Sequence, residues 1–232
     1  MLRVSEVYSS IQGEGPNVGR TTVFVRFAGC NLRCPGWPCD TQHAIDPKYR
    51  SEWAKTSSED LATQIEQCID ISGSECITLT GGEPFLQKHD DLYKLINQFP
   101  GQEIDCFSNG LLTYPEWAPN YINFIMDWKL LGSGESIESA VRLHNLHLLA
   151  KSDLDHAVKF VIKDWTDFEQ AVQIYHKHFS SYNNVIEIYY GRVWGSELTD
   201  RDLAEAVMVN GLPWRLNVQM HNYIWPANER GK

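Results

Sequence analysis

The segment TTVFVRFAGCNLRCPGWPCDT, residues 21–41, connects a short strand pattern directly to three cysteines. Alternating β-branched and aromatic residues over Thr22–Phe27 predict a half-buried strand. Cys30, Cys34 and Cys39 follow within ten residues. We therefore expect three thiolates on one loop at an edge of a sheet, where proteins often place binding and catalytic groups.

Short β-branched runs alternate with amphipathic helical patterns along the rest of the chain. Ser57 with Asp60, and Thr166 with Glu169, have the spacing of capping boxes at two helix starts. The expected strands are Thr22–Phe27, Ile77–Thr80, Ile104–Phe107, Ile122–Met126, Val158–Ile162, Val185–Tyr189 and Leu216–Met220, and the expected helices are Ser58–Ile69, Asp90–Phe99, Ile137–Leu149, Asp167–Phe179 and Asp202–Val209.

This alternation predicts an α/β fold with right-handed crossovers and a mainly parallel sheet whose outer side is covered by helices. Six or seven strands are too few for an eight-unit barrel, so we expect an incomplete (β/α) barrel or an open doubly wound sheet. In both, the chemistry lies at the carboxyl ends of the strands. No repeat or linker divides the chain, and one domain over residues 1–232 is expected.

The 232 residues include 20 basic and 30 acidic side chains, a formal net charge of -10. This charge disfavours nonspecific contact with nucleic acid or an anionic membrane surface. The start, MLRVSE, lacks the features of a secretory signal, and no segment approaches the length of a membrane span. We expect a cytoplasmic protein that acts on a small molecule, with no direct nucleic-acid or membrane partner.

The three cysteines of the loop are soft ligands that suit an iron–sulfur cluster or zinc. Either normally takes four ligands, so three thiolates leave one coordination position open. The alternatives are a structural zinc completed by His43, or a loop without chemistry. Cys68, Cys76 and Cys106 lie apart in apolar periodic segments and are expected to be core residues.

A second motif, Gly81-Gly82-Glu83-Pro84, follows the strand pattern at Ile77–Thr80. Paired glycines permit close approach of the backbone to a ligand, and the carbonyls and Glu83 are acceptors suited to an ammonium group. The alternative is a tight strand-to-helix turn.

Polar residues also end the next two strand patterns: Ser108 and Asn109 end one, and Lys129 ends the other. They are expected at the same rim as the cysteines, although each could also be ordinary turn chemistry.

Five motifs are spread over nearly the whole chain: Gln12-Gly13-Glu14-Gly15, Arg26 before Gly29-Cys30, Cys39-Asp40-Thr41, Gly81-Gly82-Glu83-Pro84 and Gln219-Met220-His221. Taken together, they resemble the 7-carboxy-7-deazaguanine synthase family of the radical S-adenosylmethionine (SAM) superfamily.

The resemblance implies a radical SAM type partial barrel with a 4Fe-4S cluster on Cys30, Cys34 and Cys39, and with SAM on the fourth iron. One electron would cleave SAM to a 5′-deoxyadenosyl radical. The radical would take hydrogen from 6-carboxy-5,6,7,8-tetrahydropterin, which contracts with loss of ammonia to 7-carboxy-7-deazaguanine, a precursor of queuosine-type nucleosides. The implied SAM-binding residues are Gly81, Gly82, Glu83, Ser108, Asn109 and Lys129.

The resemblance also assigns Thr41 to a magnesium ion that touches the substrate carboxylate, although Asp40-Thr41 could instead be a turn or helix cap. It further implies an electron donor such as flavodoxin or ferredoxin, and a homodimer.

Substrate recognition falls, by the same resemblance, on Gln12, Glu14, Arg26, Gln219 and His221. A carboxylate and an amide suit the guanidine-like edge of a pterin, and arginine suits its carboxylate. Gln219 and His221 share one face of the expected last strand, so they could instead be ordinary core or surface residues.

Two departures from the family pattern stand out. Four residues, Pro35-Gly36-Trp37-Pro38, separate Cys34 from Cys39, two more than is usual in the superfamily. Asp127-Trp128-Lys129 replaces a common Ser-Pro-Lys, so only Lys129 inherits a role.

Two other functions remain open: a glycyl-radical-enzyme activase, and a zinc-stabilised binding module without catalysis.

Overall fold

The structure is a computed structural model that describes residues 1–37, 39–135, 139–182, 185–226 and 229–231. Its described part forms one nine-stranded sheet in the order β3-β1-β2-β4-β5-β6-β7-β8-β9. The strands are β1 Leu2–Ile11, β2 Thr21–Phe27, β3 Ala54–Thr56, β4 Cys76–Gly81, β5 Glu103–Ser108, β6 Asn123–Asp127, β7 His156–Ile162, β8 Ile186–Arg192 and β9 Arg215–Leu216. Pairing from β2 to β9 is parallel, whereas β1 is antiparallel to β2 and β3. The sheet is not closed, which confirms the predicted incomplete barrel.

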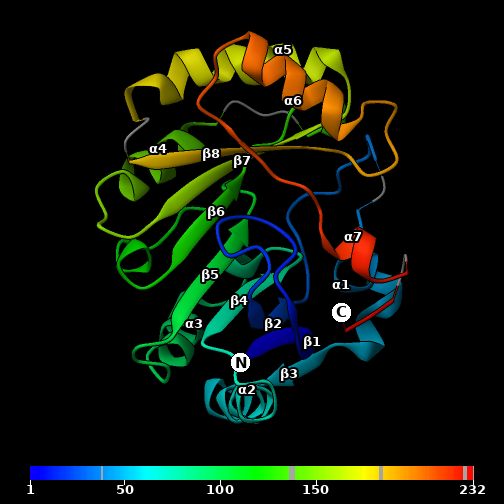
Figure 1. Ribbon diagram of the computed structural model, residues 1–232. Helices are drawn as coiled ribbons and strands as arrows, with labels where there is room; N and C mark the ends of the chain where they lie inside the picture. The colour runs from blue at the N-terminus through cyan, green and yellow to red at the C-terminus, as the bar shows by residue number, and fades with distance from the viewer. Residues whose placement is uncertain (38, 136–138, 183–184, 227–228, 232) are drawn as a thin grey trace.

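Helices cover one side of this curved sheet. They are α2 Ser58–Ser72, α3 His89–Ile96, α4 Ala140–Leu149, α5 Trp165–Ile174 and α6 Asp200–Val209. Two short helices, α1 Gln42–Ile45 and α7 His221–Ile224, do not belong to this layer. Figure 1 shows α2 to α6 along the outer side of the sheet and α1 and α7 on the opposite side. Among the described residues, no helix has the length and apolar character needed to cross a bilayer.

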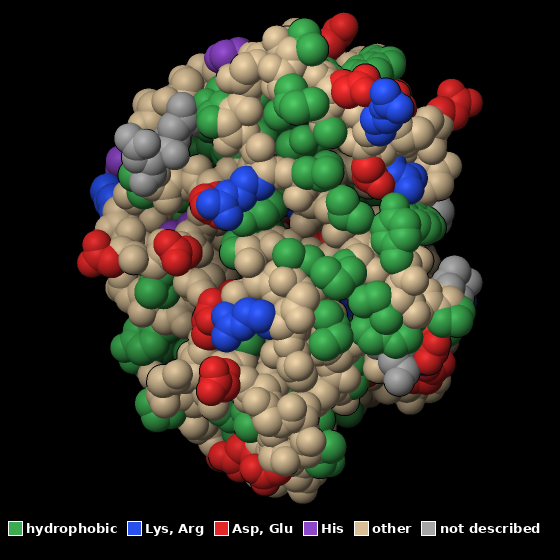
Figure 2. Space-filling model, in the orientation of Figure 1, with side chains coloured by type: hydrophobic (Ala, Val, Ile, Leu, Met, Phe, Trp, Pro, Cys, Tyr) green, Lys and Arg blue, Asp and Glu red, His purple; other side chains and the backbone are tan. Residues whose placement is uncertain are grey.

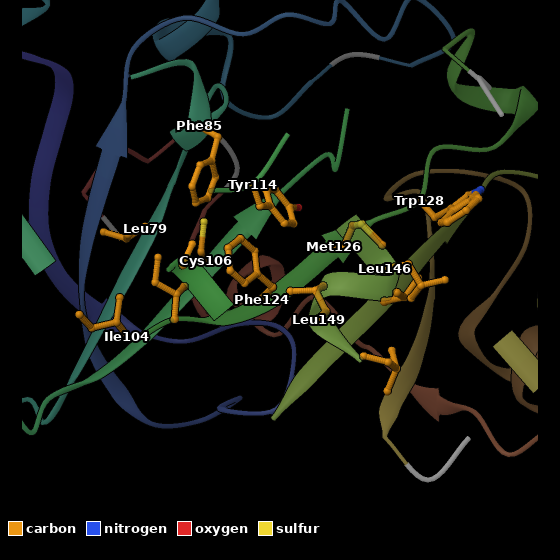
Figure 3. Packing of buried hydrophobic residues seen from close by; sticks show 14 of the residues in the cluster. Leu79, Phe85, Ile104, Cys106, Tyr114, Phe124, Met126, Trp128, Leu146 and Leu149 are labelled. Atoms are coloured by element: carbon orange, nitrogen blue, oxygen red, sulfur yellow. The ribbon is translucent and has the colours of Figure 1, made fainter. Parts of the chain in front are cut away.

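The two faces of the sheet differ because side chains alternate along each strand. The outer face is apolar: Leu79, Cys106, Phe124 and Met126 of consecutive strands are buried together, and Figure 3 shows them packed with α4. The inner face carries polar side chains beside a small apolar cluster, and several of the polar groups are buried against other parts of the chain. These inner residues include Arg26, Thr78, Asp105, Asp127 and Lys159.

The predicted core cysteines lie on the outer side. Cys76 and Cys106 are fully buried, as expected, and Cys68 is a half-buried residue that packs against the core.

The surface in Figure 2 shows basic and acidic side chains mixed with hydrophobic ones, so this face has no extended patch of positive or negative charge.

The predicted helix starts are partly right. Ser57 caps α2 by accepting a hydrogen bond from the backbone of Asp60, as expected. The Thr166/Glu169 box is wrong: Asp164 caps α5 by accepting from the backbone of Asp167. The α-helical part of α5 then ends at Ile174, and residues 175–179 form a π-helical turn. The predicted start of α4 at Ile137 lies outside the described residues.

The expected last strand, Leu216–Met220, is also wrong beyond its first residue. The chain leaves the sheet after β9, because the side chain of Asn217 turns toward Gly15 and the backbone N–H of Met220 donates to the carbonyl of Gly13. Gln219 follows the strand and His221 begins α7, so these two residues do not share a strand face.

Candidate functional site

The base of the cysteine loop is held by backbone hydrogen bonds to the turn after β4. Gly82 N–H donates to the carbonyl of Phe27 at 2.9 Å, and Glu83 N–H donates to the carbonyl of Gly29 at 2.8 Å. The N–H of Gly29 donates to Ala44 of α1 at 2.7 Å. Two motifs about 50 residues apart in the sequence are thus joined at one rim of the sheet.

Both glycines of this turn are required by close approach of the cysteine loop. A Cβ on Gly82 would lie 1.9 Å from the carbonyl oxygen of Gly29, and one on Gly81 would lie 2.2 Å from that of Phe27. Gly81 also has a φ of 117°, which favours glycine. The sequence predicted close approach of this turn to a ligand; the close approach in the structure is to the backbone of the cysteine loop, and contact with a ligand stays a prediction.

The three loop thiols are half-buried and free of disulfides. Burial raises the pKa of Cys30 to about 11 and also raises the pKa values of Cys34 and Cys39. The Sγ of Cys39 lies 3.3 Å from Oγ1 of Thr41. Metal binding deprotonates such thiols, because the positive charge of the metal stabilises the thiolates. The donor set therefore fits an iron–sulfur cluster, whose iron ions would provide that positive charge.

The zinc alternative finds no support in the position of His43. Its Nε2 lies 2.8 Å from a carboxylate oxygen of Glu6, which also accepts from Nε of Arg26 at 2.6 Å. In the described part of the chain, no three His, Cys, Asp or Glu side chains are arranged around a single metal ion. Ligands of a four-iron cluster bind different iron atoms and need not converge in that way.

Glu83 points into the protein and organises the end of β5. Its carboxylate accepts from the hydroxyl of Ser108 and from the backbone N–H of Asn109, both at 2.8 Å, and from that of Phe85 at 3.2 Å. Burial raises the pKa of Glu83 to about 7 although these donors oppose the shift. The amide of Asn109 donates to Asn31 of the cysteine loop at 2.8 Å. The predicted contact of Glu83 with an ammonium group stays a prediction.

Lys129 forms a buried ion pair at the same rim. Its Nζ lies 2.6 Å from Oδ2 of Asp127 and 6.0 Å from the ring centre of Trp37. Burial opposes the charge on Lys129, but Asp127 and the nearby thiols hold its pKa above the usual value. The second carboxylate oxygen of Asp127 is buried without a hydrogen-bond partner among the described residues.

A second polar cluster joins the two ends of the chain. Glu14 accepts from Nζ of Lys159 at 3.1 Å and from the amides of Asn217 at 3.0 Å and Gln219 at 3.2 Å. Asn217 also accepts from Gly15 N–H at 2.8 Å. We call these five residues the Glu14 clasp. Burial alone would raise the pKa of Glu14, but Lys159 and its other partners hold it below the usual value.

The other residues predicted to bind substrate lie in three different places. A Cβ added to Gly13 would lie 2.4 Å from Nδ1 of His221, so this histidine lies next to the clasp. Gln12 is buried and donates to Oγ1 of Thr78 at 3.0 Å. Arg26 belongs to a separate group with Glu6 and Tyr8.

Sequence reasoning missed Lys159 and Asn217. Lys159 had a usable signal, because a single lysine in the β-branched strand HAVKFVI must face the side opposite the apolar core. Asn217 had none, since it falls within the stretch expected to be a strand.

Comparison with known proteins agrees with the family resemblance seen in the sequence. Residues 11–117 match the family described as a 4Fe-4S single cluster domain. The 7-carboxy-7-deazaguanine synthase of Leptospira interrogans is 33% identical, covering 98% of this chain and 97% of that protein. The enzyme of the same name from Clostridium acetobutylicum is 31% identical over 99% and 98%. The crystal structure of QueE from Escherichia coli shares the fold with a TM-score of 0.73 at 20% identity, covering 95% and 94%.

Proposed function

The chain belongs to the 7-carboxy-7-deazaguanine synthase family, and we propose that it carries out the reaction in that name at the rim formed by the cysteine loop and the Glu14 clasp. It is a radical SAM enzyme that converts 6-carboxy-5,6,7,8-tetrahydropterin to 7-carboxy-7-deazaguanine with loss of ammonia. Its cofactors are a 4Fe-4S cluster and SAM. The family relationship favours this reaction over glycyl-radical activation.

One observation carries the assignment of the site. The loop with Cys30, Cys34 and Cys39 is fixed by backbone hydrogen bonds to the Gly81-Gly82-Glu83 turn, at the rim where β5 and β6 also end. The three thiols would hold the cluster, which supplies the electron that cleaves SAM. Residues around SAM would be Gly81, Gly82, Glu83, Ser108, Asn109 and Lys129.

Glu83 would contribute to SAM binding mainly by positioning. Two of its three hydrogen bonds hold Ser108 and Asn109 at the rim, where their remaining polar atoms can contact the cofactor. Lys129, paired with Asp127, would place positive charge beside the thiolates.

Thr41 is the proposed magnesium ligand. Its hydroxyl lies next to the Cys39 thiol, so an ion bound there would be adjacent to the cluster. A hydroxyl oxygen suits a hard cation, with water and the substrate carboxylate as further ligands.

The Glu14 clasp is the proposed site for the guanidine-like edge of the pterin. Lys159 keeps Glu14 ionised, and an ionised carboxylate accepts hydrogen bonds from such an edge. Gln12, Gln219 and His221 would complete this region. Arg26 uses Nε and Nη2 on Glu6 and Tyr8, so contact with the substrate carboxylate would use its other nitrogen.

The proposal extends to the whole chain and its surroundings. One sheet runs from Leu2 to Leu216, which supports a single domain over residues 1–232. We also propose a cytoplasmic location, a flavodoxin or ferredoxin as electron donor, and a homodimer.

The function is tested by anaerobic reconstitution with iron and sulfide, followed by incubation with dithionite, SAM, Mg²⁺ and the carboxypterin. We expect 5′-deoxyadenosine and the ring-contracted product by mass spectrometry. Cys39→Ala should lose both, whereas Cys68→Ala, at a cysteine outside the loop, should retain both. A reconstituted protein that cleaves SAM but yields no ring-contracted product would exclude the synthase activity.

A further inference from the structure

Cys34 has an unusual backbone. Its φ is 44°, and it is the one non-glycine residue with positive φ in the described part of the chain. Such a conformation is strained and persists only where its surroundings hold it. Contacts around Cys34 must therefore stabilise this turn.

Glu135, in the loop after β6, provides the necessary contact. One of its carboxylate oxygens, Oε1, accepts from the backbone N–H of Arg33 at 2.9 Å and from that of Cys34 at 3.3 Å. Two successive N–H groups beside a left-handed residue form a concavity that binds anions. Here the anion is supplied by the protein, about 100 residues away in the sequence.

Gly36, between Cys34 and Cys39, is held by the same loop and by Lys163. The N–H of Gly36 donates to the carbonyl of Ser133 at 3.0 Å, and Nζ of Lys163 donates to the carbonyl of Gly36 at 2.9 Å. A Cβ on Gly36 would lie 1.7 Å from the carbonyl oxygen of Gly132. The two loops are therefore in direct backbone contact.

The loop after β6 is itself supported from α5. The carboxylate of Asp167, which is fully buried, accepts from the N–H of Gly132 at 2.6 Å and from that of Lys163 at 3.0 Å. A continuous set of hydrogen bonds thus runs from the start of α5 through residues 132–135 to the cysteine loop.

We propose that residues 132–135, after β6, hold the extended cysteine loop in place, and that Glu135 is the positioning residue for Cys34. The inference rests on the proposed function only in taking Cys34 as an iron ligand. Gly36 is then a docking point rather than part of a spacer, which explains how a longer loop still presents its three thiols at one rim.

Hydrogen–deuterium exchange of the purified chain tests the contact without any cluster. Glu135→Ala should speed exchange of the amides of Arg33 and Cys34 roughly tenfold or more, because both lose a charged acceptor. Glu135→Gln keeps an acceptor oxygen and should leave protection near the wild-type level. Glu116→Ala, at an exposed glutamate, is the matched control and should change neither amide.

The reconstituted variants give an independent spectroscopic readout. Glu135→Gln should retain the iron content and the EPR signal of the reduced cluster, with a midpoint potential shifted to a more positive value because a negative charge beside the cluster is lost. Glu135→Ala should bind iron less completely and lose it faster in air.

The outcomes separate this inference from the function itself. If Glu135→Ala exchanges as slowly as wild type at both amides, Glu135 does not position Cys34. If wild type binds no iron while Glu135→Ala still loses amide protection, the proposed function fails and the contact stands.

Discussion

The cysteine loop and the Glu14 clasp are built in different ways. The base of the cysteine loop is joined to the β4 turn through main-chain atoms and through glycines that leave no room for a Cβ. The clasp is joined through side chains: Glu14 contacts Lys159 and Asn217, which lie 145 and 203 residues away in the sequence.

In the cysteine loop, the atoms that hold the structure differ from the side chains proposed to act, whereas in the clasp the same side chains do both. Backbone hydrogen bonds fix the position of the cysteine loop, so the thiols remain available for iron. At the clasp, the groups proposed to bind substrate also bind one another. Substitutions should therefore affect architecture in the first region and charge balance in the second.

The largest expected effect is that of Gly82→Ala. The new Cβ would lie 1.9 Å from the carbonyl oxygen of Gly29, and neither backbone can move without breaking the hydrogen bonds between the two motifs. We expect destabilisation of more than about 4 kcal/mol, with loss of bound iron. Thermal denaturation and iron analysis would measure both.

Two further glycine variants sharpen the comparison. Gly73→Ala has open space and only an unfavourable φ of 65°, so it should cost about 1 kcal/mol. Gly13→Ala, beside the clasp, meets mainly the side chain of His221, which can move, and should cost about 1–2 kcal/mol. If Gly13→Ala proved as damaging as Gly82→Ala, the contrast between the regions would be wrong.

The next effect is that of Lys159→Met on the clasp. It leaves the Glu14 carboxylate partly buried without its cation, and we expect a loss of about 3 kcal/mol in urea denaturation at pH 7. Adding Glu14→Gln should restore part of the stability, because the double variant no longer buries an unpaired charge. Lys55→Met, on the exposed edge strand β3, should be nearly neutral. Equal stabilities for the single and double variants would show that the unpaired Glu14 carboxylate carries no penalty.

The last prediction depends on pH and concerns Glu83. Its folded-state pKa of about 7 lies above the reference value of 4.5, so its stabilising contribution is complete below about pH 4.5 and is lost as pH rises toward 7. The stability of wild type relative to Glu83→Gln should fall by at most about 3 kcal/mol between pH 4.5 and 8. Parallel urea titrations of the apo-protein at several pH values would measure this difference. Parallel curves for the two proteins would mean that Glu83 does not titrate in this range.

Local patterns predicted the parallel strands β4 to β8 and the outer helices, but not β1. A register shift between Val4 and Glu6 breaks the alternation of side chains, so the core-facing residues change from Leu2 and Val4 to Val7. Glu6 and Tyr8 are polar because they face the inner side beside Arg26. A bulge of this kind depends on the partner strand and leaves no clear period in the sequence.

The candidate site shows the same division. Cys30, Cys34 and Cys39 could be identified from spacing, because ligands on one loop are close together in any fold. The arrangement around Glu14 could not, because its partners come from β7 and from the segment after β9. Family resemblance suggested Glu14 and Gln219, while Lys159 and Asn217 became visible only in the folded chain.

By itself, then, the sequence determined the strand–helix alternation, the apolar outer face, the loop of three thiols and the glycine turn. Each of these depends on residues close together in the chain. Tertiary structure decided that the glycine turn supports the cysteine loop, that Glu135 binds the backbone at Cys34, and that the two ends of the chain meet at Glu14. The physical reason is that hydrogen bonds and ion pairs act over a few ångströms, and only the folded chain brings distant residues within that distance.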